Sequence, residues 1–132
     1  MPNENDGSAI ILVVHDVEEI RDGVAALLQS DGYRVDPARN EEEAVSKAKC
    51  APPDLVLVSL GESDADVMVI SRRIRDRAGL SEGIPLVIFC VSSVAEGAEV
   101  ELANRTYFTR PDDFDQLRRF LAGLLHRLPA TS

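Results

Sequence analysis

Three short and nearly uninterrupted apolar stretches dominate the hydrophobic pattern of the chain, at residues 9–14, 55–60 and 86–91. Continuous apolarity over so few residues is typical of a strand that is covered on both faces of a sheet, as in the centre of a parallel sheet. Two shorter segments, residues 33–35 and 107–109, are predicted to be further strands. The pattern therefore predicts five strands.

Segments of helical periodicity lie between these strands. Asn40 with Glu43 three residues later predicts a capped helix start, and that helix ends before Pro52. A weakly patterned helix is expected within residues 95–104, and Pro111 and Asp112 suit the start of the last helix. The apolar positions that define the other helices are Val17, Ile20, Val24, Leu27 and Leu28, then Val67, Ile70 and Ile74, and finally Phe114, Leu117, Leu121, Leu124 and Leu128.

Strand and helix thus alternate five times, which predicts an α/β fold: a doubly wound five-stranded parallel sheet with five helices. One domain is expected over residues 9–128, after a flexible lead at 1–8 and before residues 129–132, which have the composition of a tail or linker start. In such sheets functional residues gather at the carboxyl ends of the strands.

Composition narrows the function classes. The 132 residues carry a formal net charge of -9, which disfavours binding to nucleic acid or to an anionic membrane. No apolar run approaches a membrane span and the start does not resemble a signal peptide, so a cytoplasmic protein is expected. Cys50 and Cys90 lack metal-ligand spacing and are interpreted as reduced thiols.

Polar side chains follow the predicted strands, and here a family resemblance appears. The segments ILVVHDVEEIR, PDLVLVSL, IPLVIFC and YFTRP, which begin at residues 11, 53, 84 and 107, resemble successive parts of response-regulator receiver domains. The resemblance covers about residues 9–128. It implies a flavodoxin-like sheet with strand order 2-1-3-4-5 and a role in two-component or phosphorelay signal transduction.

The site positions depart from that family. The family's acidic pair falls on His15 and Asp16, its phosphoacceptor aspartate on Ser59, its switch hydroxyl on Cys90 and its lysine on Arg110. A serine hydroxyl needs a neighbouring base to attack a phosphoryl group, and His15 is the nearby candidate. Because Mg²⁺ prefers carboxylate oxygens, the changes predict that Ser59 is not phosphorylated and that Mg²⁺ binding is lost or weak, with no other cofactor.

Each singled-out residue also has a structural interpretation. The Ser59 hydroxyl is expected to bond the backbone, His15 to be a solvated loop imidazole or to pair with Asp16, and Arg110 to form a salt bridge with Asp16. Cys90 is expected to be a packing residue. The switch aromatic of the family falls on Tyr107, which is expected to be fixed in or out, or to be an amphipathic edge-strand residue. The arginines Arg72, Arg73, Arg75 and Arg77 are expected to form a solvated face, or less readily to meet an acidic partner.

These features predict a pseudo-receiver: a non-enzymatic signalling module that contacts a protein partner, or itself, without a phosphorylation cycle. The resemblance implies a contact face made of the last helix, the last strand and the preceding helix, to which Arg118, Arg119 and Arg127 would add positive charge. The alternatives are a receiver phosphorylated on an unusual acceptor, Ser59 or His15, and a small α/β cofactor-binding domain. Against the latter, no glycine-rich loop follows the first strand.

The charge is divided unevenly along the chain. Residues 1–66 hold 15 acidic and 5 basic side chains, a net charge of -10, whereas residues 67–132 hold 8 and 9, a net charge of +1. The sequence therefore predicts a polarised surface around a neutralised pocket, which favours protein contact over phosphate chemistry.

Overall fold

A computed structural model describes residues 9–60, 63–89, 95, 97–101, 105–110 and 113–127 of the chain. Within these ranges the chain forms one mixed sheet of order β2-β1-β3-β4-β6-β5 with four helices. The strands are β1 (Ile10–His15), β2 (Arg34–Ala38), β3 (Leu55–Ser59), β4 (Leu86–Phe89), β5 (Glu99–Glu101) and β6 (Thr106–Thr109). The helices are α1 (Glu18–Ser30), α2 (Glu41–Cys50), α3 (Asp64–Ala78) and α4 (Phe114–Arg127).

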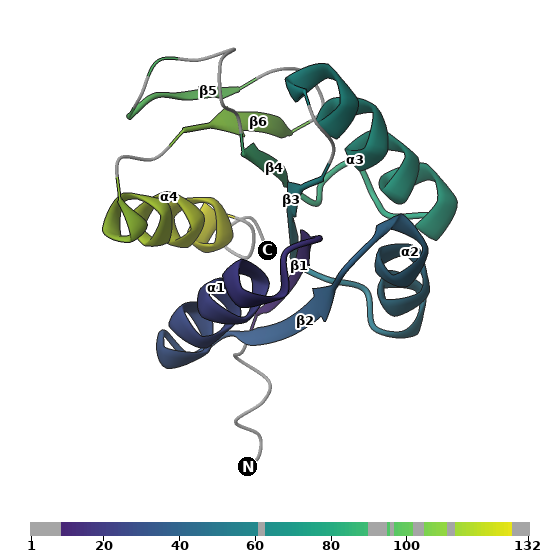
Figure 1. Cartoon of the computed structure of the whole chain (residues 1–132), viewed down its shortest axis with the longest axis horizontal. Helices are drawn as coiled ribbons and strands as arrows, with labels where there is room; N and C mark the ends of the chain where they lie inside the picture. The colour runs from purple at the N-terminus through teal and green to yellow at the C-terminus, as the bar shows by residue number, and fades with distance from the viewer. Residues whose placement is uncertain are drawn as a thin grey trace.

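The helices cover the sheet from both sides. In Figure 1, α1 and α4 lie on one side of the sheet and α2 and α3 on the other, while the strands run from β2 at the bottom of the view to β5 at the top. Each of the two faces has its own apolar core. The central strands β1 and β3 contribute to both cores because successive side chains point to opposite faces. The predicted doubly wound α/β architecture is confirmed, and the five parallel strands follow the expected 2-1-3-4-5 order.

Local signals in the sequence set several helix ends. Asn40 accepts a hydrogen bond from the Glu43 N–H at 2.8 Å, so the predicted cap of α2 is present. Ser63 caps α3 in the same way, accepting from the Asp66 N–H at 3.1 Å. Gly79 ends α3 in the left-handed region at φ 69°, a conformation that favours glycine.

The helix predicted within residues 95–104 is wrong. The described part of this segment holds β5, which pairs antiparallel with β6. Gly97, at φ 83°, donates its N–H to the Arg110 carbonyl, and the Arg110 N–H bonds the Ala98 carbonyl. Gly97 and Ala98 thus both oppose Arg110, which is a β-bulge with glycine at its first position. The bulge leads into β5. The alternating Glu99, Val100 and Glu101 then continue with the period of a strand, so the sheet has a sixth strand and the described residues hold four helices rather than five.

The first helix is also less buried at its start than its spacing predicts. Val17 and Ile20 are 43% and 47% exposed, whereas Val24 and Leu28 are buried in the core. Phe114, at the start of α4, is 56% exposed. Helical spacing therefore overestimates the core at both helix starts.

Candidate functional site

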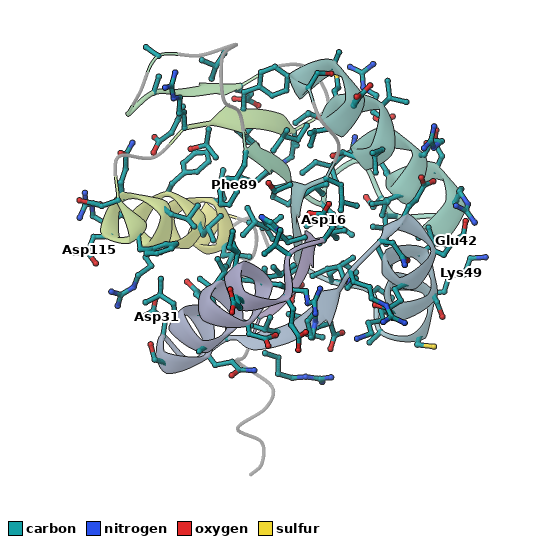
Figure 2. All side chains as sticks on the ribbon, in the orientation of Figure 1. Asp16, Asp31, Glu42, Lys49, Phe89 and Asp115 are labelled. Carbon is teal, nitrogen blue, oxygen red and sulfur yellow. The ribbon has the colours of Figure 1, made fainter. Side chains whose placement is uncertain are left out.

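The candidate site lies at the carboxyl ends of β1 and β3. His15 and Ser59 are the last residues of these strands and are direct register partners. Their side chains lie on the α1 and α4 face of the sheet, because Val13 and Leu57, two residues earlier, belong to that core. The structure therefore brings together the two residues that the sequence placed at the strand ends. Figure 2 shows Asp16 in the same region, and Phe89 marks the end of β4.

His15 is held by its own backbone neighbourhood. Its Nδ1 accepts the Val17 N–H at 3.0 Å, and Arg21 donates from Nη1 to the His15 carbonyl at 3.0 Å. Burial lowers the pKa of the imidazole below 6.5; Asp16 opposes this shift and Arg21 adds to it. The imidazole is therefore neutral at pH 7, and because Nδ1 accepts a hydrogen bond its proton sits on Nε2. The solvated interpretation of His15 is wrong, since only 14% of its side chain is exposed.

Asp16 is the one carboxylate that remains at the family's acidic pair. Its side chain is 65% exposed, and Oδ1 lies 3.5 Å from Nδ1 of His15. Within the described ranges, Asp16 makes no ion pair with Arg110, so that predicted salt bridge is wrong. The Asp16 carboxylate is therefore solvated and is not enclosed between the strand ends.

Ser59 is half-buried at the end of β3. Its hydroxyl makes no hydrogen bond within the part of the chain that is described, so the expected bond to the backbone is not formed. His15 is also a poor base for this hydroxyl, because the only lone pair of the neutral imidazole, on Nδ1, already accepts the Val17 N–H. The Ser59 hydroxyl and the Nε2–H of His15 can therefore both donate hydrogen bonds, but His15 cannot act as a base for Ser59.

The site also lacks an evident set of metal ligands. Among the described residues, no three His, Cys, Asp or Glu side chains come close enough together to hold a metal ion. The donor set at the strand ends consists of one exposed carboxylate, one hydroxyl and one imidazole, which does not fit the oxygen-rich coordination that Mg²⁺ requires. Cys90, the predicted switch position, lies outside the described residues.

Tyr107 and Arg110 lie on the far side of the site. Tyr107 is 4% exposed, and its ring meets Phe120 of α4 edge-on, with 5.7 Å between ring centroids and 79° between planes. It therefore points inward, and because β5 covers the side of β6, the edge-strand interpretation of Tyr107 is wrong. Arg110 is half-buried, and its backbone closes the bulge with Gly97 and Ala98.

The arginines of α3 do not form a free basic face. Arg73 and Arg77 bond the carboxylate of Glu41 in α2 at 2.7 and 3.0 Å, and Arg77 also binds Glu42 at 2.8 Å. These hydrogen bonds lower the pKa of Glu41 and Glu42. Arg75 is 7% exposed and donates from Nη2 to the Ile84 carbonyl at 2.9 Å. The solvated interpretation of this run is wrong for the buried Arg75, whereas Arg73 and Arg77 stay exposed but are paired with α2.

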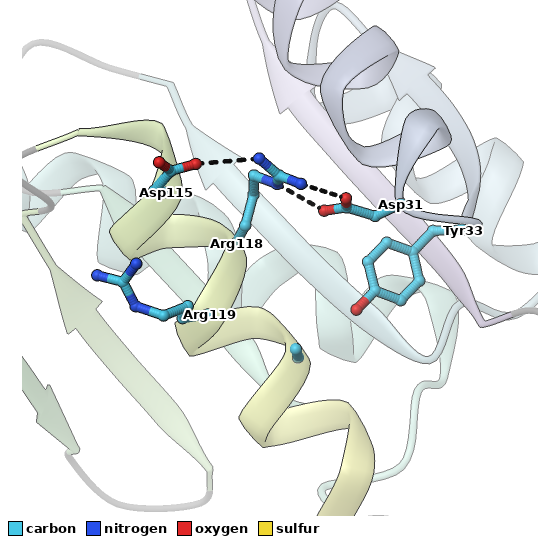
Figure 3. Close-up of a pocket in the computed structure, with 6 residues that line it drawn as sticks. Asp31, Tyr33, Asp115, Arg118 and Arg119 are labelled. Carbon is cyan, nitrogen blue, oxygen red and sulfur yellow. Dashed lines mark hydrogen bonds and ion pairs between the residues drawn. The ribbon is translucent and has the colours of Figure 1, made fainter.

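An open groove of about 410 Å³ separates the end of α1 from α4. Arg118 closes one side: its guanidinium binds Asp31 at 2.6 Å and Asp115 at 3.0 Å, as Figure 3 shows. The bond from Arg118 lowers the pKa of Asp31. Burial and the Asp31 charge raise the pKa of the neighbouring Tyr33 phenol. The predicted positive face of the last helix is therefore partly neutralised, with Arg119 exposed and the Arg127 side chain outside the described residues.

Sequence reasoning missed this groove. Asp31 and Arg118 are 87 positions apart, and no local spacing joins them. The only signal was the placement of Asp31 in the turn that follows α1, next to a strand at the edge of the sheet.

No protein-family model matches the chain. Among curated proteins it is 29% identical over 128 residues to the transcriptional regulatory protein TrcR of Mycobacterium tuberculosis, covering 92% of this chain and 48% of TrcR. It is 26% identical to KdpE of Escherichia coli, a KDP operon transcriptional regulatory protein, covering 92% of this chain and 53% of KdpE. The chain thus spans about half the length of these curated relatives.

Solved receiver structures superpose closely. The chemotaxis protein CheY4 of Vibrio cholerae matches with a TM-score of 0.68 at 21% identity, over 89% of this chain and 99% of that one. The receiver domain of the Francisella response regulator 1452 matches with a TM-score of 0.70 at 17% identity, over 91% and 98%. No helix among the described residues is long and apolar enough to cross a bilayer. The chain has the fold of solved response-regulator receiver domains, and the curated proteins that it resembles are transcriptional regulatory proteins.

Proposed function

We propose that this chain is a receiver-like signalling module that contacts other proteins without a phosphorylation cycle and without catalytic activity of its own, in the cytoplasm. The observation that carries the proposal is the pairing of His15 with Ser59 at the strand ends. In this pairing the acceptor position holds a hydroxyl, and the lone pair of its neighbour is already occupied by the Val17 N–H.

Electrostatics at the site support the same conclusion. A receiver site with three carboxylates and one lysine would have a formal charge of -2, which favours a divalent cation. With a neutral His15, Asp16, Ser59 and Arg110 the formal charge is zero. A site without excess negative charge has little to gain from binding Mg²⁺, and the transfer of a phosphoryl group would lack its metal.

Protein contact remains the function that a receiver fold without this chemistry supports. The chain has an uneven surface charge, and its acidic residues lie mainly in the first half. Charged surfaces of this kind steer association with oppositely charged partners. The curated relatives are transcriptional regulators about twice as long as this chain, which is consistent with a role as one part of a regulatory assembly.

The test is phosphate uptake. The purified chain is incubated with acetyl phosphate and Mg²⁺, and its intact mass is measured. We expect no phosphorylated species. The matched control is the double variant His15→Asp with Ser59→Asp, which restores carboxylates at both strand ends and is expected to gain Mg²⁺ affinity and a phosphorylated species.

A wild-type chain that takes up phosphate and loses the label in Ser59→Ala would overturn the proposal and establish an unusual acceptor. A label lost only in His15→Gln would point to the imidazole instead. For the interaction itself, Ser59→Ala and wild type are expected to retain the same partner proteins from cell extract, with or without acetyl phosphate.

A further inference from the structure

The two edges of the sheet differ in their capacity to accept another strand. β2 forms one edge and β5 the other. At the β2 edge, Pro37 has no N–H, and its carbonyl accepts a hydrogen bond from Lys47 of α2. That edge therefore offers an incomplete ladder. All three residues of β5 are exposed and none is a proline.

Backbone geometry shows which groups of β5 face outward. In an antiparallel ladder, residues alternate between bonding the partner strand and facing away from it. The Arg110 N–H bonds the Ala98 carbonyl, so two residues later Val100 bonds β6 at its register partner Phe108. The N–H and C=O groups of Glu99 and Glu101 consequently point away from β6. The outer edge of β5 thus presents two donors and two acceptors in the spacing of a strand.

The strand is also fixed in place, as a docking template must be. Gln116 of α4 donates from Nε2 to the Gly97 carbonyl at 2.7 Å and to Oε2 of Glu99 at 3.2 Å. On its other side, β5 is paired with β6 over three residues. A preorganised edge loses less conformational freedom when a partner binds.

The side chains select the kind of partner. Glu99 and Glu101 lie on one face of β5, and Val100, which is 39% exposed, lies on the other. Opposite charges directly across a strand pair are favourable and like charges are unfavourable. A second copy of β5 would bring four carboxylates into one strip. A strand with basic residues at alternate positions and an apolar residue between them is complementary to this edge.

We infer that β5 is a strand-addition site for an extended basic segment of a partner protein, which pairs its backbone with Glu99 and Glu101 and its Lys or Arg side chains with their carboxylates. The inference rests on the proposed function, a protein-contact module, and names the surface. This surface differs from the contact face predicted from the sequence. That face included a helix before the last strand, and the structure has the strand β5 there.

The probe is a fluorescein-labelled decapeptide of alternating Lys and Val, titrated with the full chain at physiological salt and followed by anisotropy. Glu101→Pro removes one outward N–H while leaving the bonds to β6 intact, and it is expected to weaken binding about tenfold. Glu101→Lys is expected to abolish binding of this peptide and to favour a Glu and Val peptide. The matched control is Glu19→Lys, an equal charge change on the exposed start of α1, which is expected to leave affinity unchanged.

Amide exchange separates strand addition from charge attraction alone. With peptide bound, the N–H groups of Glu99 and Glu101 should gain protection, whereas Val100, already bonded to β6, should not. A peptide N-methylated at alternate residues should fail to bind. Absence of binding by the wild-type chain would overturn the inference, as would binding that Glu101→Pro and N-methylation leave unchanged. Phosphate uptake by Ser59 would instead overturn the proposed function without affecting this result.

Discussion

The two faces of the sheet are built in different ways. On the α1 and α4 face, large side chains fill the core: Leu117, Leu121 and Leu124 of α4 are buried, and Phe120 packs against Tyr107. On the α2 and α3 face, α2 contributes small side chains, Ala44 and Ala48. Both faces bury large side chains of the sheet, but α4 adds large apolar volume to the first face, whereas α2 approaches the second face closely through small side chains and is joined to α3 by ion pairs.

This difference explains where the charged residues are used. Ion pairs between α2 and α3 involve Glu41, Glu42, Arg73 and Arg77, so much of the apparent surface charge of these helices serves to hold them together. On the opposite face, Arg118 joins α4 to the end of α1. Fewer charged side chains are therefore available to bind a partner than the composition suggests. The exposed glutamates of β5 become correspondingly more important.

The largest effect is expected on the face held by volume. Leu121→Ala removes a fully buried side chain from the α4 core and should lower the free energy of unfolding by about 2–5 kcal/mol. Urea denaturation measures this change. The control Val69→Ala, at a residue that is 52% exposed on α3, should stay within about 0.5 kcal/mol of wild type. Equal losses in both variants would contradict the assignment of the core.

The opposite change should break the face held by close approach. Ala48→Leu adds volume where α2 packs on the sheet at 1% exposure and should cost about 1–3 kcal/mol of stability. Ala65→Leu, at an exposed position in α3, adds the same volume in water and serves as the matched control. If Ala48→Leu were as stable as this control, α2 would not pack closely at this position.

The ion pairs between α2 and α3 should contribute less than either packing change. Glu41→Gln removes the carboxylate that Arg73 and Arg77 share, so the urea midpoint should fall. The fall should be small, because ion pairs at the surface contribute modestly and are screened by salt. The difference from wild type should shrink in about 1 M NaCl. Glu82→Gln, an exposed residue outside the cluster, is the control. A difference that salt does not reduce would argue for packing rather than charge.

The smallest expected effect is a pH dependence at His15. Because burial lowers its folded pKa below 6.5, the unfolded chain binds more protons than the folded chain just below that pH. Stability should therefore be complete above about pH 6.5 and decline as the pH falls through the folded pKa. Thermal melts between about pH 7.5 and 5.5 should show a larger loss of Tm for wild type than for His15→Gln.

The acidic groups do not obscure this window. The pKa values of Asp31, Glu41, Glu42 and Glu43 are lowered from ordinary values near 4, so their contributions are lost only as the pH falls further. An identical slope for wild type and His15→Gln would show that protonation of His15 does not disturb the Val17 hydrogen bond.

Much of the fold could be predicted because its signals are local. The buried runs, the Asn40 cap and the glycine that ends α3 each act within a few residues, and each is present in the structure. The register that pairs His15 with Ser59 followed from the order of the strands. Strand ends therefore placed the main residues of the candidate site without any knowledge of their contacts.

The errors have two physical causes: a partner that is distant in sequence, or a local turn that hydrophobic periodicity does not describe. The arginines of α3 have the pattern of a solvated face until α2 places Glu41 beside them. The Nδ1 hydrogen bond of His15 depends on a turn that periodicity does not describe. At 97–101, one glycine bulge outweighed a weak helical pattern, and a strand formed where a helix was expected.

Pro37 has a consequence for how copies of this chain can assemble. A sheet with two open edges can pass strand pairing from one molecule to the next and grow into an open-ended polymer. Here Pro37 and its bond to Lys47 interrupt the edge at β2, and like charges disfavour β5 against itself. Strand pairing is thus limited to one partner per molecule, so any complex formed through β5 should have one-to-one stoichiometry and a defined size.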